Sequence, residues 1–287
     1  MALAALFAVV GAALVLIGGD DGTTTTESDR GAGGLTGGDF HSLVVDPSDP
    51  QRLFAGGHQA VSVSTDGGAT WTEVEELRDA DAMGWAFTDD AVYVSGHPGL
   101  NRSTDGGETF EQVNEGLPDT DLHAFGGSDT VLYGASPAVG VFASDSGRGE
   151  WQVRNDSIGH SFFGRVLVDP GDDDHILAAD ASAGVAESAD GGRSWRLLDS
   201  GLDSATWISR GGDDLEVLVA SGPAGAALSD DAGRSWRPLD VPQGVSLVEA
   251  VPGDADVLYA GRHEGDRVHV LVSTDGGTTW TAATEPP

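Results

Sequence analysis

The chain of 287 residues contains no cysteine and no lysine, and its 14 basic residues face 47 acidic ones. Without cysteine, disulfide bonds and metal sites with thiolate ligands are excluded. The formal net charge of −33 argues against nucleic acid and anionic membrane surfaces as partners, because both would repel the chain. The partners that stay open are a small ligand, a metal ion or another protein, and we expect the chain to be a monomer.

The acidic residues are spread through the chain rather than gathered in one tail. In this respect the composition resembles that of the lysine-poor, halophilic proteins of salt-loving archaea, in which surface carboxylates hold water and cations. The charge is therefore interpreted as a means of staying soluble in brine rather than as a binding feature.

Long apolar runs are scarce, and the run over residues 2–17 lies at the start of the chain. It is short for a membrane span of about 20 residues and long for the core of a signal peptide. The sequence predicts an N-terminal hydrophobic anchor or signal over residues 1–19, followed by a flexible tether over residues 20–38. No clear cleavage site follows, which favours an anchor in the cell membrane with the rest of the chain on the extracytoplasmic side. If the segment is cleaved, the protein is secreted.

One octet is repeated along the remaining chain, first as "STDGGATW" and last as "STDGGTTW". The copies begin at intervals of about 40 residues, a period that fits one four-stranded propeller blade. They occupy residues 64–71, 103–110, 144–151, 188–195, 229–236 and 273–280.

The letters of the octet suit a tight turn. A carboxylate can accept backbone N–H groups across the turn, glycine permits a backbone conformation barred to other residues, and the aromatic residue can anchor the turn from beneath. The aspartates are Asp66, Asp105, Asp190, Asp231 and Asp275, and the aromatic residues are Trp71, Phe110, Trp195, Trp236 and Trp280. The third copy is degenerate and has Ser146 in place of the aspartate. The octet resembles the Asp-box, or BNR repeat, and we interpret it as structural because a turn is needed in every repeat and a catalytic group only once.

Short alternating segments fill the spaces between the octets. In the first repeat they span residues 41–47, 52–58, 60–66 and 70–76, each bounded by turn residues. The same division works in the other repeats. The sequence therefore predicts an all-β fold over residues 39–287, a six-bladed β-propeller of four-stranded antiparallel blades with Asp-box turns. We expect the last and first blades to meet without exchanging strands.

Histidines occupy equivalent places in neighbouring repeats. In the predicted propeller they lie on the face opposite the Asp-boxes, at the start of inner strands or the end of second strands. Imidazole suits zinc and copper, and a thioether would favour copper. The predicted metal ligands are His41, His58, His97 and His123, with Met83 and His263 as additions. Asp39, Asp81 and Asp121 could orient the imidazoles. The alternative for each histidine is an ordinary hydrogen bond to backbone.

Other residues near the predicted blade entrances have two interpretations each. Trp85, Trp207, Phe125 and Phe163 line a pocket or, as is more frequent for such aromatics, pack between blades. Arg165, Arg210 and Arg262 bind an anion or pair with neighbouring aspartates.

Asp-boxes recur in sialidases, xyloglucan-cleaving hydrolases, the sortilin luminal domain and photosystem II assembly propellers. A closer resemblance covers residues 39 to about 280. The segments "DFHS" (39–42), "MGW" (83–85), "GHPG" (96–99) and "LHA" (122–124) resemble those of small anchored Asp-box proteins that are labelled glycosyl hydrolases. Asp39 and Ser42 depart from the His and Gly of that pattern.

The resemblance leaves the question of catalysis open. No Arg-Ile-Pro stretch is present, and Tyr93, Tyr133 and Tyr259 fall within predicted strands, which disfavours a sialidase site. We identify no catalytic residue. The sequence therefore favours a ligand-binding module, for a metal ion or for a protein partner in an assembly role, and the alternative is an exo-glycosidase.

Overall fold

The computed structural model describes residues 35–36, 40–58, 60–145, 149–264 and 267–283. These belong to one compact unit, Ala32–Pro287. The predicted anchor and most of the predicted tether lie outside the described residues. Among the residues described, no helix is long and apolar enough to cross a membrane.

Three sheets consist of four consecutive antiparallel strands each. The first holds β2 (Phe40–Asp46), β3 (Asp49–Gly57), β4 (Val61–Ser64) and β5 (Thr72–Glu73). The second holds β6 (Asp81–Phe87), β7 (Val92–His97), β8 (Gly99–Ser103) and β9 (Glu111–Gln112). The third holds β18 (Trp207–Gly211), β19 (Val217–Gly222), β20 (Gly225–Ser229) and β21 (Arg237–Leu239).

The remaining strands form two larger sheets. An eight-stranded sheet contains β10 (Ala124–Gly127), β11 (Val131–Ser136), β12 (Gly140–Asp145), β13 (Trp151–Asn155), β14 (Phe162–Asp169), β15 (Asp172–Asp180), β16 (Gly184–Ser188) and β17 (Arg196–Leu198). A five-stranded sheet contains β22 (Val245–Val251), β23 (Asp254–Glu264), β24 (Arg267–Ser273), β25 (Thr281–Ala282) and the short β1 (Leu35–Thr36).

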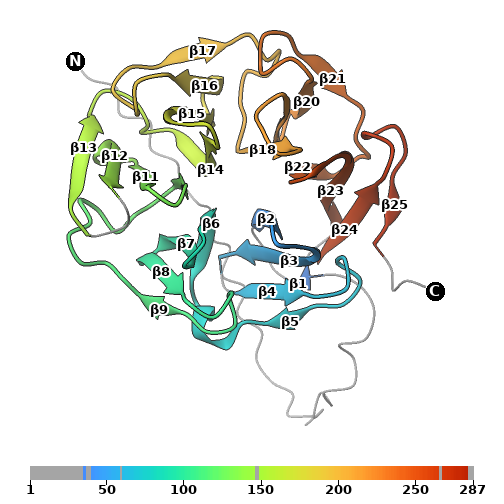
Figure 1. Ribbon diagram of the computed structural model, residues 1–287. Helices are drawn as coiled ribbons and strands as arrows, with labels where there is room; N and C mark the ends of the chain where they lie inside the picture. The colour runs from blue at the N-terminus through green and yellow to red at the C-terminus, as the bar shows by residue number, and fades with distance from the viewer. Residues whose placement is uncertain (1–34, 37–39, 59, 146–148, 265–266, 284–287) are drawn as a thin grey trace, which may run out of the picture. The chain divides into compact units, whose positions relative to one another are not determined.

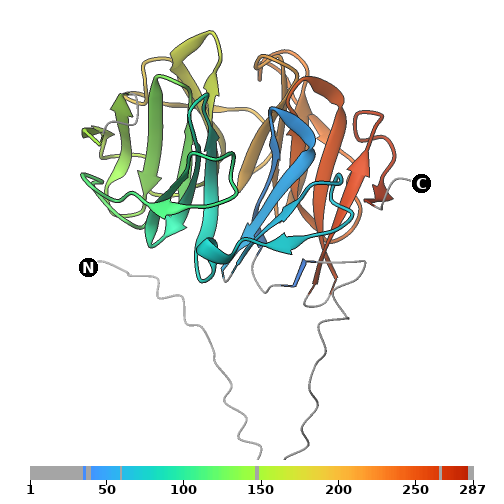
Figure 2. The ribbon, with the colours of Figure 1, turned by 60° about the horizontal axis from the view of Figure 1, so that its bottom comes forward.

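The sheets are arranged in a ring in sequence order, with the first strand of each quartet innermost (Figure 1). The quartet that begins with β2 lies beside the one that begins with β22, and β2 contacts β22, so the ring closes (Figure 2). The prediction of an all-β propeller built from four-stranded antiparallel sheets is confirmed.

The six separate sheets that a six-bladed propeller predicts are not observed. Hydrogen bonds group the described strands into five sheets, because the innermost strands β10 and β14 pair in parallel at Ala124↔Gly164 and Phe125↔Arg165. Glycine permits this approach: a Cβ on Gly126 would stand 1.8 Å from the carbonyl oxygen of Val166.

The closure of the ring also differs from the prediction. The short β1 pairs antiparallel with β24, so a segment from the N-terminal side joins the last sheet. The reason is the short length of β25, which pairs only with Leu271 and Val272 of β24. The first residues of β24 on that side are therefore open to β1. Pairing satisfies backbone groups that an open edge would expose.

The outer strands are shorter than predicted. In the first repeat β5 ends at Glu73, and the chain turns into the 3₁₀ helix η2 (Glu75–Leu77) instead of continuing as a strand to residue 76. This turn places Leu77 in the core with no exposed surface. Burial of a leucine side chain is worth about 1.5–3 kcal/mol, which offsets the loss of one or two outer-strand hydrogen bonds.

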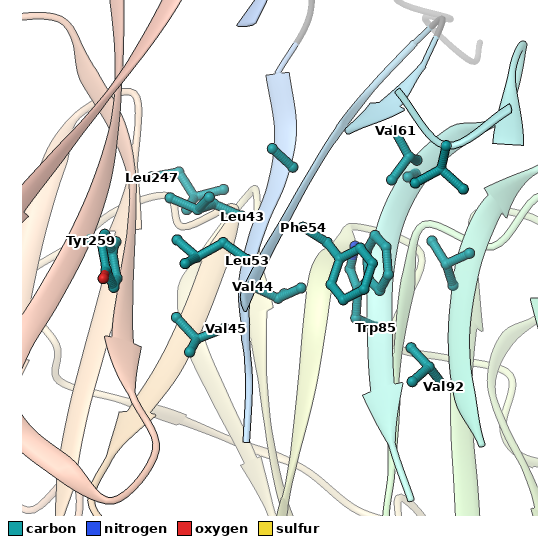
Figure 3. Close-up of a cluster of buried hydrophobic side chains, with 14 of the residues drawn as sticks. Leu43, Val44, Val45, Leu53, Phe54, Val61, Trp85, Val92, Leu247 and Tyr259 are labelled. Atoms are coloured by element: carbon teal, nitrogen blue, oxygen red, sulfur yellow. The ribbon is translucent and has the colours of Figure 1, made fainter. Parts of the chain in front are cut away.

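The core lies between the sheets. Figure 3 shows one cluster in which Leu43 and Phe54 of the first sheet meet Trp85 of the second, while Leu247 and Tyr259 approach from the last. The inner strand β2 is buried continuously from Ser42 to Asp46, since a strand packed on both faces has no solvent side. Trp85, Trp207 and Phe125 are fully buried, which supports their interpretation as core residues.

Candidate functional site

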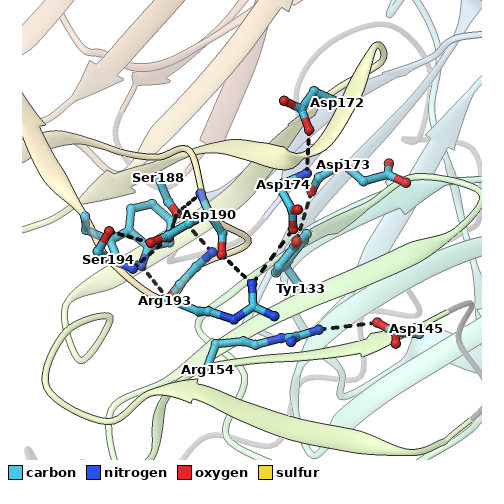
Figure 4. A network of polar contacts seen from close by, with 12 residues as sticks. Tyr133, Asp145, Arg154, Asp172, Asp173, Asp174, Ser188, Asp190, Arg193 and Ser194 are labelled. Atoms are coloured by element: carbon cyan, nitrogen blue, oxygen red, sulfur yellow. Dashed lines mark hydrogen bonds and ion pairs between the residues drawn. The ribbon is translucent and has the colours of Figure 1, made fainter.

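The octets form compact hydrogen-bonded corners. In the fourth copy Ser188 Oγ donates to Asp190 Oδ1 (2.9 Å) and accepts the N–H of Gly192 (2.9 Å), while the N–H of Ser194 donates to Asp190 Oδ1 (2.8 Å). Figure 4 shows this corner beside Arg193. The hydroxyl of Ser194, which donates to Asp190 Oδ2 (2.6 Å), together with the N–H of Ser194 and the hydroxyl of Ser188, lowers the pKa of Asp190 to about 2. The indole N–H of Trp195 donates to the carbonyl of Gly192 (3.0 Å) and so ties the aromatic residue to the turn.

The degenerate third copy lacks part of this network. Ser144 is as buried as Ser188, but its Oγ makes no hydrogen bond within the described part of the chain. Residues 146–148 lie outside the described residues. Trp151 begins β13 and packs edge-on against Phe142, with ring centroids 5.6 Å apart.

The histidines lie at the other end of the strands. Neighbouring strands are antiparallel, so the start of an inner strand lies beside the end of the second strand, on one face of the ring. The Asp-box follows the third strand and therefore lies on the opposite face. His41 is the second residue of β2, His58 follows the end of β3, and His97 ends β7. Asp81 begins β6, and Asp121 and His123 precede β10.

Two histidines surround Asp81. His41 Nδ1 lies 2.7 Å and His58 Nδ1 lies 3.3 Å from Asp81 Oδ1. The two imidazole rings meet edge-on, with centroids 4.9 Å apart. Each of the three side chains offers a donor atom, and these atoms lie within 4.8 Å of one another, a spacing that could hold a metal ion.

A second group forms around Asp121. His123 Nε2 lies 2.8 Å from Asp121 Oδ1, and His97 Nε2 contacts the same oxygen. These donor atoms also lie within 4.8 Å of one another. His97 links the groups, because its Nδ1 lies 3.5 Å from Asp81 Oδ2. The structure therefore brings together His41, His58, His97 and His123, the four histidines predicted as ligands.

Asp81 is the deepest member of the site, with 5% of its side chain exposed. Burial raises the pKa of its carboxyl, but the hydrogen bond with His41 and the charges of the neighbouring imidazoles lower it, and the net direction is below the usual value. Asp81 Oδ2 is buried and makes no hydrogen bond within the described residues. A buried carboxylate oxygen in this state favours a cation.

Two predicted additions take other positions. His263 lies on β23, where its ring packs edge-on against Phe40 at 6.1 Å and its backbone N–H donates to the carbonyl of Gly244. It belongs to neither group. Met83 is buried in β6 at a bulge, two residues after Asp81. Asp39 lies outside the described residues.

Phe163 is the one aromatic candidate that reaches the site. At the start of β14 it packs edge-on against His41 and His123, with centroid distances of 5.4 and 5.8 Å. It thus forms a common apolar wall for one histidine of each group.

Arg165 pairs with a buried glutamate on a distant strand rather than with the neighbouring aspartate that the sequence allowed. Arg165 Nη1 on β14 donates to Glu249 Oε1 on β22 (2.9 Å), and the indole of Trp207 on β18 donates to Oε2 (2.9 Å). Burial raises the pKa of Glu249, against the lowering effect of Arg165. The sequence did contain one indication of this pair: Glu249 is the single charged residue in the apolar segment "VSLVEAV". Arg165 is therefore paired, and Arg210 donates to the carbonyl of Gly212.

A family model for the BNR/Asp-box repeat matches residues 271–282, which include the last octet. The chain carries Asp-box repeats. The corners described above are the structural expression of that motif, and their resemblance to Asp-boxes is confirmed. The comparison with curated protein sequences finds no match.

Solved structures show the same fold at low sequence identity. A GH74 xyloglucanase from Xanthomonas campestris superposes with a TM-score of 0.60 at 19% identity, over 88% of this chain and 46% of the enzyme. YCF48 from Cyanidioschyzon merolae has a TM-score of 0.53 at 17% identity, over 86% of this chain and 85% of that one. A further structure of YCF48, bound to D1 peptide, has a TM-score of 0.51 at 17% identity, over 88% and 84% of the two chains. This Asp-box chain spans less than half the length of the xyloglucanase.

Proposed function

We propose that this protein is a binding propeller that holds a divalent transition metal on the face opposite its Asp-boxes. The observation that carries the proposal is the convergence of His41, His58, His97 and His123 on Asp81 and Asp121. Imidazole nitrogen and carboxylate oxygen are donors that Zn²⁺, Cu²⁺ and Ni²⁺ accept.

The scaffold in this proposal has six blades, each half of the eight-stranded sheet acting as one blade of a monomer. Residues 1–19 anchor the chain in the cell membrane, with the propeller on the extracytoplasmic side. The likeness of the fold to YCF48 bound to D1 peptide supports a second candidate, a peptide or protein partner on the same face.

A glycosidase site gains less support. Such a site needs two carboxyl groups at a set separation, one to protonate the leaving group and one to activate water or attack the sugar. Two carboxyl groups at the histidine face, those of Asp81 and Asp121, are each in contact with imidazoles. Similarity to the xyloglucanase concerns the fold and less than half of that enzyme.

Metal content of the full chain tests the proposal. We expect the purified protein in molar salt to retain Zn²⁺ or Cu²⁺ after dialysis, as measured by elemental analysis. His58→Ala and His97→Ala should each reduce the retained metal, because each removes a ligand. His263→Ala is the matched control and should leave the content unchanged, since His263 lies outside both groups.

Two results decide against the proposal. One is metal at background level in the wild-type chain, and the other is unchanged binding in both ligand variants. Met83→Leu separates the metals: loss of copper with retention of zinc would show that the thioether takes part.

A further inference from the structure

The histidine cluster is two groups rather than one ring of ligands. His41 and His58 direct their Nδ1 atoms to Asp81 Oδ1, whereas His97 and His123 direct Nε2 to Asp121 Oδ1. Each group by itself supplies two imidazole nitrogens and one carboxylate oxygen within 4.8 Å. A site with three protein ligands can bind a metal ion and leave a coordination position for water or another ligand.

Asp81 and His97 connect the groups. Asp81 presents Oδ1 to His41 and His58, and its other oxygen, Oδ2, to Nδ1 of His97. His97 turns its remaining nitrogen to Asp121. A metal ion on His97 Nε2 leaves Nδ1 to carry the proton and to donate it to Asp81 Oδ2, the oxygen without a hydrogen bond. One carboxylate would then bind an ion in the first group and orient a ligand in the second.

The two groups differ in depth. In the first group the side chains of His41 and Asp81 are 14% and 5% exposed and that of His58 is 55% exposed, whereas those of His97, Asp121 and His123 are 49%, 41% and 27% exposed. Phe163 packs against His41 on one side and His123 on the other. The carboxylate and one imidazole of the first group are therefore largely buried, whereas all three side chains of the second group are partly open to solvent.

We propose that the cluster binds two divalent transition-metal ions at neighbouring positions that are coupled through Asp81 and His97. The first ion takes His41 Nδ1, His58 Nδ1 and Asp81 Oδ1, and the second takes His97 Nε2, His123 Nε2 and Asp121 Oδ1. This inference rests on the proposed metal-binding function. It adds the stoichiometry, the division of ligands and the coupling.

Calorimetric titration of the full chain with Zn²⁺, together with elemental analysis, tests the stoichiometry. We expect two ions per chain in the wild type and in His263→Ala. His58→Ala should retain one, and His123→Ala should also retain one, because each change removes a ligand from a different group. Asp121→Asn, at a more exposed position, repeats the second test if His123→Ala does not fold.

Asp81→Asn tests the coupling. It should weaken both positions, by about 10–100-fold at the second, where Asp81 acts only through the orientation of His97. Asp121→Asn should weaken the second position alone. Equal affinity of the second position in the wild type and in Asp81→Asn would overturn the coupling.

The possible stoichiometries separate the two proposals. Two ions support both, and no ion overturns both. One ion in the wild type that is lost in both His58→Ala and His123→Ala leaves the metal-binding function standing and overturns the second position. Loading with Cu²⁺ gives an independent reading: two neighbouring ions should couple and reduce the paramagnetic resonance signal per copper, and His123→Ala should restore it.

Discussion

A buried serine hydroxyl makes the same hydrogen bonds in five of the six Asp-box corners. Ser188 Oγ is buried, donates to Asp190 and accepts from the backbone N–H of Gly192. The same serine recurs as Ser64, Ser103, Ser229 and Ser273, and in each case its hydroxyl accepts the N–H of the glycine four residues later. The corner thus depends on the serine as much as on the better-known aspartate.

Ser188→Ala should destabilise the protein by about 1–3 kcal/mol, because it leaves the buried N–H of Gly192 without an acceptor. Ser144→Ala is the matched control. Ser144 is equally buried at the same place in the degenerate copy, and its hydroxyl makes no hydrogen bond within the described residues. Its loss should leave the free energy of unfolding unchanged or raise it, because an unpaired buried hydroxyl is itself unfavourable. Urea unfolding measures both, and equal costs would contradict the role assigned to the hydroxyl.

At the scale of strands, glycine sets how closely the inner strands approach. A Cβ on Gly84 of β6 would meet the backbone N of Phe125 on β10 at 2.6 Å and the carbonyl oxygen of Gly164 on β14 at 2.7 Å. Contacts below 3.0 Å with backbone require a strand to move. The same strands carry Asp81, His123 and Phe163 at or near their beginnings, so their spacing sets the geometry of the site.

Gly126→Ala should destabilise the fold by about 1–3 kcal/mol or more, since the added methyl would overlap the carbonyl oxygen of Val166 and push β10 from β14. Gly171→Ala is the control in an exposed turn, where the nearest atom to an added Cβ is 3.5 Å away and no positive φ is required. It should be close to neutral. The midpoints of thermal unfolding compare the two, and a neutral Gly126→Ala would contradict the close approach.

Sequence alone predicted the elements made by local contacts. The Asp-box corners close within eight residues, and alternation and turn residues located most of the inner strands. The pairing of β10 with β14 and of β1 with β24 depends on distant segments, which local patterns do not encode. Equivalent positions in neighbouring repeats predicted the four clustered histidines. His263 lies apart because its ring packs edge-on against Phe40, a contact between distant segments that the repeat pattern does not encode.

At the scale of the whole molecule, one charged pair joins inner strands that are far apart in the sequence. Arg165 on β14, Trp207 on β18 and Glu249 on β22 meet through two hydrogen bonds of 2.9 Å. The side chains of Arg165 and Glu249 are 10% and 0% exposed. The chain has a net charge of −33, yet this arginine pairs with a buried carboxylate instead of lying on the surface. A buried ion pair adds little to the free energy of unfolding compared with two apolar side chains of similar size. Removing one of its partners, however, is strongly destabilising.

Arg165→Met should cost about 3–5 kcal/mol at neutral pH, because Glu249 would stay buried without its hydrogen-bonded guanidinium and with only the weaker charge effect of Arg210. Adding Glu249→Gln should recover part of the loss, since the amide oxygen can still accept from Trp207.

Burial raises the pKa of Glu249 in the folded state, so its ionisation penalty is absent below the unfolded pKa of about 4.3 and grows as pH rises above it. The stability difference between the single and double variants should therefore be small near pH 4 and large near pH 7. Urea unfolding at constant salt across that range measures it, and a difference that does not change with pH would show that Glu249 is not a buried carboxylate held by Arg165.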